Sequence, residues 1–434
     1  MDRKARWFPG YGVAAAATVA TIASAPGQTF ILSQINLPLR HAFGIDELTL
    51  NSMYTVATVA AAFPLVWIGT WADRLGPRLM LVLIAFAYGF GCLVMASAQG
   101  VITVFLGFFL LRLFGQGSLS LVAQHALAMW FHRRLGALHG WKTVLTFAAW
   151  VPFPGIAVYL IHTLGWRGSY LVFAMAIPLV VAPISFWLVR NRPEDLGLHL
   201  DGDTPDAAPW KESEEELAPD PTAPDPESAA DIPPREPGFS LKEARRTRAF
   251  WLLAAVFFLP PMIGTAFLFD MQPMLGARGM TEHDAAIVVS AWSATMAILA
   301  LPAGWVTDRV RPGVLLAFSL AMVALSSLVL WQARTPVAAG LAMVIFGFGQ
   351  SVGGSCASAT VARFFGRANH GAIRSSLTRI AVIGTGLGPV IFGLSVRLTG
   401  GYTPAMIGFA AACLPVLAGV LFMTKPVQEQ GKIL

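Results

Sequence analysis

The feature that most constrains this chain is a series of apolar runs long enough to cross a lipid bilayer. About twelve runs of roughly 20 residues are present, and they begin near Tyr11, Leu50, Arg78, Gly100, Gly140, Ser169, Ala249, Ala285, Pro312, Pro336, Gly371 and Pro404. The chain is 56% hydrophobic and only 12% charged, about half the charged fraction of a soluble domain. Since lipid cannot bond backbone groups, such runs predict helices. We therefore expect an all-α membrane protein with twelve transmembrane helices.

The placement of the basic residues predicts the orientation. If the N-terminus lies inside, the outer segments hold only Arg40, Arg167, Arg278, Arg334 and Arg397. The inner segments hold many more basic residues: Arg3, Lys4, Arg6, Arg74, Arg78, Arg133, Arg134, Lys142, Arg309, Arg311, Arg363, Arg367, Arg374, and those of the linker and the tail. This asymmetry follows the positive-inside rule. We expect a multi-pass protein of the inner (plasma) membrane with both termini in the cytoplasm. The net charge of +6 thus reflects topology, and nucleic acid is not an expected partner.

The first residues and the cysteines have simple interpretations. The segment 1–25 resembles a secretory leader that ends in Ala23-Ser24-Ala25. Its removal would leave an odd number of helices, so we favour a retained first helix. The three cysteines lie in apolar runs without metal-ligand or redox spacing, and neither a metal nor a cofactor is expected.

A repeated phrase divides the chain into two halves. The sequence reads GTWADRLGPR at 69–78 and GWVTDRVRP at 304–312. Two further pairs recur at a similar spacing: FGQ at 114–116 and 348–350, and the segments 27–30 and 264–267. Such self-similarity indicates structural repeats. We predict an N-terminal six-helix half at 1–190, a C-terminal six-helix half at 248–425 and a tail at 426–434.

The segment between the halves differs from the rest of the chain. Residues 194–236 hold 14 of the 24 acidic residues and many prolines. Because this composition cannot bury a core, we expect 191–247 to be a cytoplasmic linker. A tether is the simpler role, and a regulatory docking site is the alternative.

The two copies of the aspartate phrase resemble the signatures between helices 2 and 3 and between helices 8 and 9 of the major facilitator superfamily. Arg112 with Gly115 and Gly117 resembles the helix-four signature, and Gly165-Trp166-Arg167 also fits the family. The resemblance covers the chain outside the linker. It implies two pseudo-symmetric halves, alternating access around a central site, and a monomeric functional unit.

Finer motifs are similar to the bacterial branch of monocarboxylate transporters and oxalate/formate antiporters. They are RPEDLGL at 192–198, HGAIR at 370–374, and the glycines and proline of 384–393. Two departures stand out. The helix at 285–303 has no charge where that branch often carries an arginine, and 150–155 matches poorly the glycine-rich signature of antiporters.

An ionisable group at membrane depth is a functional candidate, because it is costly to place there. Arg112 lies about 18 Å into the fourth helix at 1.5 Å per residue. Gln116 follows four residues later, on the same side of a helix. A guanidinium suits a carboxylate bidentately, so Arg112 could neutralise a substrate anion that Gln116 orients. Alternatively, Arg112 bonds backbone carbonyls and has a structural role.

Two other charged residues have open roles. Asp270 is the acid of the seventh helix and the candidate for proton coupling; the alternative is a solvated helix end. Arg379 lies in the inner third of the eleventh helix, where it is either a second anion contact or a residue that extends to the interface.

Neutral residues complete the predicted substrate site. Gln28 follows the helix-interrupting Pro26-Gly27, and such breaks can face a central cavity. Gln350 is the amide of the other half. Tyr54 and Trp292 could line the cavity, although aromatic side chains in helices are more often packing residues.

The aspartate phrases are assigned a different role by the family resemblance. Related residues latch the inner sides of the two halves when the cavity faces out. Contacts that form in only one state bias the equilibrium between states. The latch residues expected here are Gly69, Asp73, Arg74, Gly76, Arg78, Asp308 and Arg309.

The chain has no phosphate-binding loop of the GxxxxGK[ST] type, and no catalytic constellation stands out. We therefore expect a secondary transporter, not an enzyme, that moves small organic anions, preferably monocarboxylates, with a proton or in exchange. The main alternative is efflux of amphipathic compounds by proton antiport. A remote alternative is a transporter-like sensor that signals through the linker.

Overall fold

The computed structural model describes residues 8–131, 134–202, 239–307, 309–366 and 370–426. Within these ranges, ten helical segments are long and apolar enough to cross a membrane. One of them, at 137–188, breaks at Gly165 (φ +71°) and supplies two crossings. Helices α4 (Glu47–Ala62) and α5 (Leu65–Leu75) together supply another crossing. The described chain therefore crosses twelve times, and the predicted all-α fold is confirmed.

Six crossings form the N-terminal half. Besides α4 and α5, its elements are α1 (Pro9–Ala23), η1 (Ala25–Gly27), α2 (Thr29–Leu32), η2 (Ser33–Ile35), α3 (Asn36–Phe43), α6 (Pro77–Ala96), α7 (Val101–Leu110), η3 (Leu111–Leu119), α8 (Ser120–Trp130), α9 (Leu135–Trp150) and α10 (Phe153–Leu188). The first crossing comprises α1 to α3, and the fourth comprises α7, η3 and α8. Two short turns follow, η4 (Glu194–Leu196) and η5 (Leu200–Gly202).

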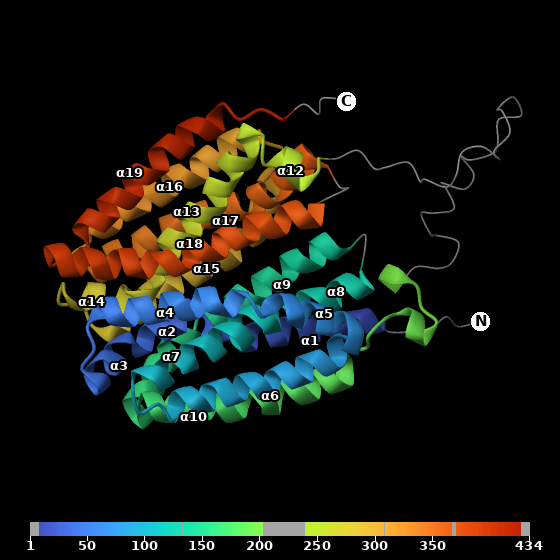
Figure 1. Cartoon of the computed structure of the whole chain (residues 1–434), viewed down its shortest axis with the longest axis horizontal. Coiled ribbons are helices and arrows are strands. Elements are labelled where there is room, and N and C mark those ends of the chain that lie inside the picture. The colour runs from blue at the N-terminus through green and yellow to red at the C-terminus, as the bar shows by residue number, and fades with distance from the viewer. Residues whose placement is uncertain (1–7, 132–133, 203–238, 308, 367–369, 427–434) are drawn as a thin grey trace, which may run out of the picture.

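A short helix, α12 (Leu241–Ala244), lies within the predicted linker, just before the C-terminal half. The crossings of that half are α13 (Arg248–Phe269) with α14 (Met271–Gly276), α15 (Glu282–Thr307), α16 (Pro312–Gln332), α17 (Pro336–Phe365), α18 (His370–Thr399) and α19 (Thr403–Leu421). The two halves lie side by side as separate bundles (Figure 1). The predicted tail after residue 426 and most of the predicted linker lie outside the described residues.

The helix starts follow from local chemistry. Pro77, Pro312 and Pro336 begin helices close to where the apolar runs predict them, because proline lacks the N–H that a first turn leaves unpaired. The side chain of Asp46 accepts a hydrogen bond from the Thr49 amide and so caps α4. The run boundaries in the sequence therefore locate the helices within about two turns.

The first crossing is interrupted at Pro26 and Gly27, as the sequence predicts. The interruption frees backbone carbonyls, which cannot remain unpaired in lipid. Tyr88 donates to the Ser24 carbonyl at 3.0 Å and Tyr170 donates to the Pro26 carbonyl at 3.1 Å. Side chains from α6 and α10 therefore stabilise the break.

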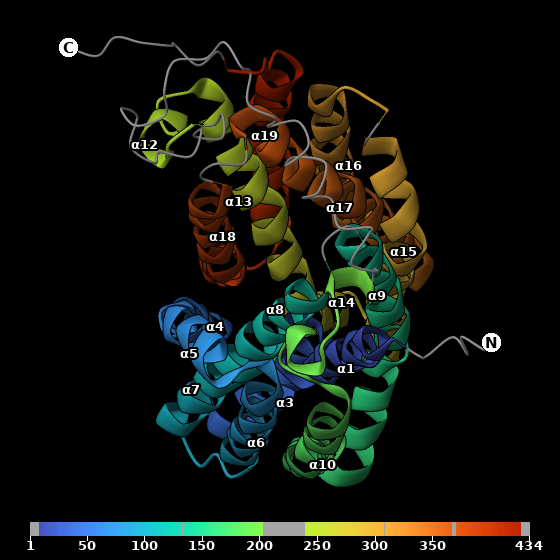
Figure 2. The ribbon, with the colours of Figure 1, turned by 90° about the vertical axis from the view of Figure 1, so that its right-hand side faces the viewer.

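The halves are joined mainly at one end of the bundle. The start of α1 and the end of α19 lie at the opposite end, which we call the terminus face (Figures 1 and 2). We call the other end, where α3 and α14 lie, the closed face. There the ring of Tyr54 stacks on that of Phe269 across the halves, with centroids 4.1 Å apart. Both side chains are fully buried.

Helices α13 and α18 pack closely because glycines line the contact. A Cβ added at Gly388 would meet the Met262 carbonyl oxygen of α13 below any normal contact distance, whereas one added at Gly408 on α19 would meet nothing within 4 Å.

We therefore expect Gly388→Val to destabilise the fold by about 1–3 kcal/mol, the usual cost of overpacking. Thermal unfolding of the purified protein in detergent would show a lower Tm. Gly408→Val is the matched control, and an equal loss in both variants would contradict the packing argument.

Candidate functional site

A cavity of about 330 Å³ lies between the two halves. Its walls come from α4, α5 and η3 of the N-terminal half and from α13 and α18 of the C-terminal half. Arg112 and Gln116 both line it, together with Thr58, Pro261 and Thr385. The structure thus brings the predicted charge and its predicted amide partner into one cavity.

Arg112 is buried, with 5% of its surface exposed. Its Nη1 donates to the Thr29 hydroxyl at 3.3 Å and to the Gly27 carbonyl at 3.5 Å. The guanidinium also lies over the Tyr54 ring, 5.1 Å from its centroid. Within the described residues no carboxylate pairs with Arg112. Since a guanidinium has five N–H donors, these contacts leave donors available for a ligand.

Gln116 has unused hydrogen-bonding capacity beside this charge. Its Oε1 atom is buried without a partner in the described structure. An unpaired buried polar atom is costly, so a donor group on a bound molecule would relieve it.

The fourth crossing is not a regular α-helix at this point. Residues Leu111–Leu119 form a π-helical stretch, η3, and the Ser118 hydroxyl donates to the Leu113 carbonyl five residues earlier. Such wide turns are rare and often occur at functional sites. The sequence predicts a helical crossing here but gives no sign of these wider turns, and Arg112 and Gln116 share the cavity nonetheless.

The C-terminal half contributes a second amide. Gln350 accepts a hydrogen bond from the Trp292 indole at 3.0 Å and lines a smaller cavity of about 180 Å³. Pro261 of α13 lines this cavity as well as the one that holds Arg112. Gln350 and Trp292 are therefore hydrogen-bonded to each other within the C-terminal half. Pro261 separates them from the cavity that holds Arg112.

The remaining predicted contacts are less direct. Gln28 donates to the Ser24 hydroxyl at 2.9 Å. Tyr54 is fully buried, and its hydroxyl lies 2.8 Å from that of Thr29, so it supports Arg112 from within the protein. Arg379 is exposed on α18, where Thr378 and Ala381 line the Arg112 cavity.

Asp270 lies at the closed face with none of its surface exposed, so the alternative of a solvated helix end is wrong. Asn51 of α4 donates to both of its carboxyl oxygens, at 3.1 and 3.0 Å, and Asn36 of α3 donates to Oδ1 at 3.3 Å. Asn51 also donates to the Pro389 carbonyl at 2.8 Å. The C-terminal half is thus bonded to two helices of the N-terminal half.

A second cross-half contact lies nearby. Tyr402 donates to Glu47 at 2.7 Å, and Arg40 pairs with the other carboxyl oxygen of Glu47 at 3.1 Å. The sequence alone does not point to Asn36, Asn51, Glu47 or Tyr402. The available signal was weak: a few polar residues near the ends of apolar runs.

The predicted latch residues lie near the terminus face. Arg78 donates to the Phe186 carbonyl at 2.8 Å and Arg309 donates to the Trp305 carbonyl at 3.2 Å, so both bond within their own half. The backbone of Gly76 has a φ of +81°, and the side chain of Asn191 lies where a Cβ on Gly76 would stand. Arg74 is exposed and Gly69 is half-buried. Asp308 lies outside the described residues, and of Asp73 only the backbone is described.

A second buried cation lies in the N-terminal half. Lys142, which the charge pattern of the sequence counts with the inner segments, lies inside α9 with 7% of its surface exposed. Its ammonium group donates to the Thr21 hydroxyl at 3.3 Å. The apolar residues around it, from Leu135 to Trp150, were the signal that this segment is helical.

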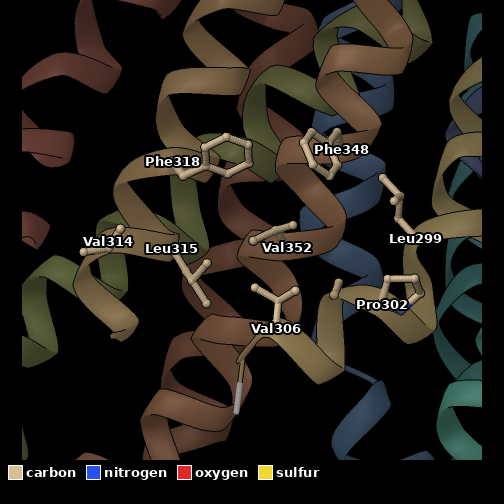
Figure 3. A pocket seen from close by; sticks show the side chains of 9 residues that line it. Leu299, Pro302, Val306, Val314, Leu315, Phe318, Phe348 and Val352 are labelled. Carbon is tan, nitrogen blue, oxygen red and sulfur yellow. The ribbon is translucent and has the colours of Figure 1, made fainter. Parts of the chain in front are cut away.

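Another hollow does not resemble a polar site. The groove of about 310 Å³ on α15, α16 and α17 is lined only by apolar residues, among them Leu299, Phe318 and Phe348 (Figure 3). It lies within the C-terminal half and offers no group that could recognise a charge.

Comparison with known proteins identifies the architecture. The sequence model described as Major Facilitator Superfamily matches residues 15–281 and 261–433. No curated protein is significantly similar in sequence. The fold resembles the D-xylose-proton symporter (TM-score 0.70, 13% identity, 98% of this chain and 99% of that one). It also resembles a bacterial homologue of the human lysosomal transporter Spinster, captured inward-facing and unoccupied (0.62, 15%, 97% and 95%).

A third solved structure of this fold is the human organic anion transporter MFSD10 (TETRAN), with a TM-score of 0.60 and 14% identity over 95% of this chain and 100% of that one. At these identities the likeness to the three structures establishes the fold alone.

The hydroxyl of Thr29 is expected to help hold Arg112 in place, and a substitution at Thr29 can test this. Thr29→Val keeps the shape but removes the hydroxyl that Arg112 and Tyr54 share. We expect a loss of about 1–3 kcal/mol in stability, because buried polar atoms lose their partner. Thr163→Val is the control, since Thr163 is exposed and bonds only its own helix. Equal Tm values for the Thr29 variant and the wild type would contradict this role.

Proposed function

The chain belongs to the major facilitator superfamily, and from that premise we propose that it is a secondary transporter working by alternating access. Its preferred substrates are small organic anions, monocarboxylates in particular, moved by proton symport or exchange. The observation that carries this proposal is Arg112, a buried cation without a carboxylate partner among the described residues, in a cavity between the halves.

The charge of Arg112 favours an anionic substrate. A buried guanidinium that bonds only neutral groups pays a large desolvation cost. A carboxylate entering the cavity would offset that cost and accept two parallel hydrogen bonds. The unpaired Gln116 oxygen would accept a hydrogen bond from a hydroxyl group of the substrate. This arrangement also supports a structural role for Arg112 in the unoccupied state, through the Gly27 carbonyl.

The size of the cavity favours a small molecule. Its volume of about 330 Å³ lies near the lower end of the usual range for ligand sites, about 300–1,000 Å³. A monocarboxylate of a few carbon atoms fits this space better than a large amphipathic compound. In this proposal four further residues lie along the substrate's path between the halves and contact the substrate after the halves close further: Gln350, Trp292, Gln28 and Arg379. Tyr54 has a different role, because it positions Arg112.

The orientation completes the proposal. Both termini lie in the cytoplasm of a cell whose plasma membrane holds the protein, as the basic residues predict. The closed face is then the outer face, and the structure corresponds to a state open to the cytoplasm. The described bonds of Arg78 and Arg309 stay within their own halves, as expected of a latch that engages only in the opposite state.

Two relatives of the same fold have compatible activities. One solved structure is that of an organic anion transporter and another that of a proton symporter. They show that this architecture serves both anion transport and proton coupling. The assignment for this chain rests on its own residues.

Uptake into proteoliposomes tests the substrate class. With a panel of labelled monocarboxylates and dicarboxylates and an inward proton gradient, we expect uptake that Arg112→Gln reduces roughly 10- to 100-fold, since a hydrogen bond to a charged group contributes about 1.5–3 kcal/mol. Arg334→Gln, in an exposed loop, is the control. If folded protein moves none of the acids, efflux of larger organic molecules becomes the better interpretation.

The latch has a separate test. Asp73→Asn removes a charge from the phrase at 69–78 without changing its size. We expect normal expression, slower turnover and a larger inward-open population, because the opposite state loses its stabilising contacts. Turnover in proteoliposomes equal to that of the wild type would refute the latch.

A further inference from the structure

The closed face contains an unbalanced group of buried charges. Asp270 is fully buried and Glu47 is 6% exposed. Arg40 lies one turn after Asn36 on α3, and Glu47 lies one turn before Asn51 on α4. Both charged groups therefore stand beside the two amides that bond Asp270. Arg40 pairs with Glu47 and not with Asp270. One cation therefore faces two carboxyl groups at a site that is closed to water.

The surroundings supply no further compensating charge among the described residues. His41 on α3 and Asp46 before α4 are exposed, and the exposed Arg397 of α18 acts on Asp46. Arg278 donates to the Leu330 and Ala333 carbonyls. From the C-terminal half Tyr402 contributes a hydroxyl, which Glu47 already uses, and Gln272 of α14 is neutral.

Glu47 and Asp270 differ in their partners. Glu47 receives a guanidinium and a phenol, both of which stabilise an ionised carboxylate. Asp270 receives only the neutral amides of Asn36 and Asn51. Two carboxylates that share a buried site do not both remain ionised. If one proton is present, Asp270 is the group that holds it.

One of the two amides has room for that proton. The Oδ1 atoms of Asn36 and Asn51 are buried without a donor. The two ends of an amide exchange places by a half-turn of the group. After a half-turn of Asn36, which gives up its 3.4 Å bond to the Phe269 carbonyl, the amide oxygen would face Asp270, and a protonated carboxyl group could donate to it. Asn51 would keep its orientation, because its amide nitrogen also donates to the Pro389 carbonyl. The site can therefore hold either a neutral or an ionised Asp270.

We propose that Asp270 is a proton-binding site and that closure of the outer face takes up one proton there. When the halves separate at this face, Asp270 loses Asn36 and Asn51, meets water and releases the proton. When they close, the protonated carboxyl group is enclosed between α3, α4 and α13. The inference rests on the alternating access of the proposed function, but not on any particular substrate.

Two spin labels can report the state of this face. Ile102 and Val337 are 83% and 82% exposed at the starts of α7 and α17, one in each half. Placed there in a variant lacking the three cysteines and held in lipid nanodiscs, the labels would report the inter-half distance from about pH 5 to about pH 9. We expect the ratio of open to closed molecules to rise with pH, approaching tenfold per pH unit for a single proton.

Variants assign this dependence to the carboxyl pair. Asp270→Asn mimics the neutral group, so the face should stay closed over the whole range. Glu47→Gln lets Arg40 balance Asp270, so the slope should flatten, and this variant carries the test if Asp270→Asn does not fold. Asp46→Asn is the matched control, because it removes an exposed acid beside Glu47 and keeps a good helix cap; it should retain the wild-type slope.

Three results would overturn the proposal: a wild type that ignores pH, an Asp270→Asn variant with an unchanged slope, or a ratio that responds to sodium ions at constant pH instead. Failure of the transport proposal looks different. In that case no acid is taken up into proteoliposomes, while the labels still report a proton-dependent face.

Discussion

The structure depends on one constraint: lipid offers no partner for a polar group. Every backbone break and every buried charge must therefore be satisfied by the protein. The break at Pro26 and Gly27 shows how this works. The Pro26 and Gly27 carbonyls accept hydrogen bonds from Tyr170 and Arg112. Tyr88 adds a second bond to the Ser24 carbonyl, which also accepts from the Gly27 amide. The broken helix, the two tyrosines and the buried arginine are consequently parts of one solution, and the arginine reaches the cavity because of it.

The same constraint explains how the halves are joined. In lipid, the apolar surfaces of two bundles gain little free energy by packing together. Polar contacts therefore contribute much of the specificity of the interface between the halves. At the closed face these contacts are the bonds of Asn51 and Asn36 to Asp270 and of Tyr402 to Glu47. They join the halves in the arrangement that this structure shows. A joint made of a few hydrogen bonds can open at moderate cost, whereas the packed core within each half cannot.

Much of the fold could be predicted because membrane crossing leaves a direct trace in sequence. Length, apolarity and the repeated phrases determine the helices and the two halves. Arg112 and Gln116 were predicted as a pair for the same reason: a charge in an apolar run is conspicuous. Contacts between distant segments leave no such trace. Asn51 looks unremarkable in the sequence until the fold brings Asp270 beside it.

Arg112 and Asp270 lie at different levels of the same interface, and this separation bears on coupling. Tyr54 contacts both levels, since its ring lies under Arg112 and stacks on Phe269, the residue before Asp270. If the halves separate at the closed face, as the proposed alternating access requires, the Tyr54–Phe269 stack breaks, which changes the support of Arg112 and uncovers Asp270 together. A carboxylate at Arg112 and a proton at Asp270 would then be linked through one aromatic contact, without any direct contact between the two ligands.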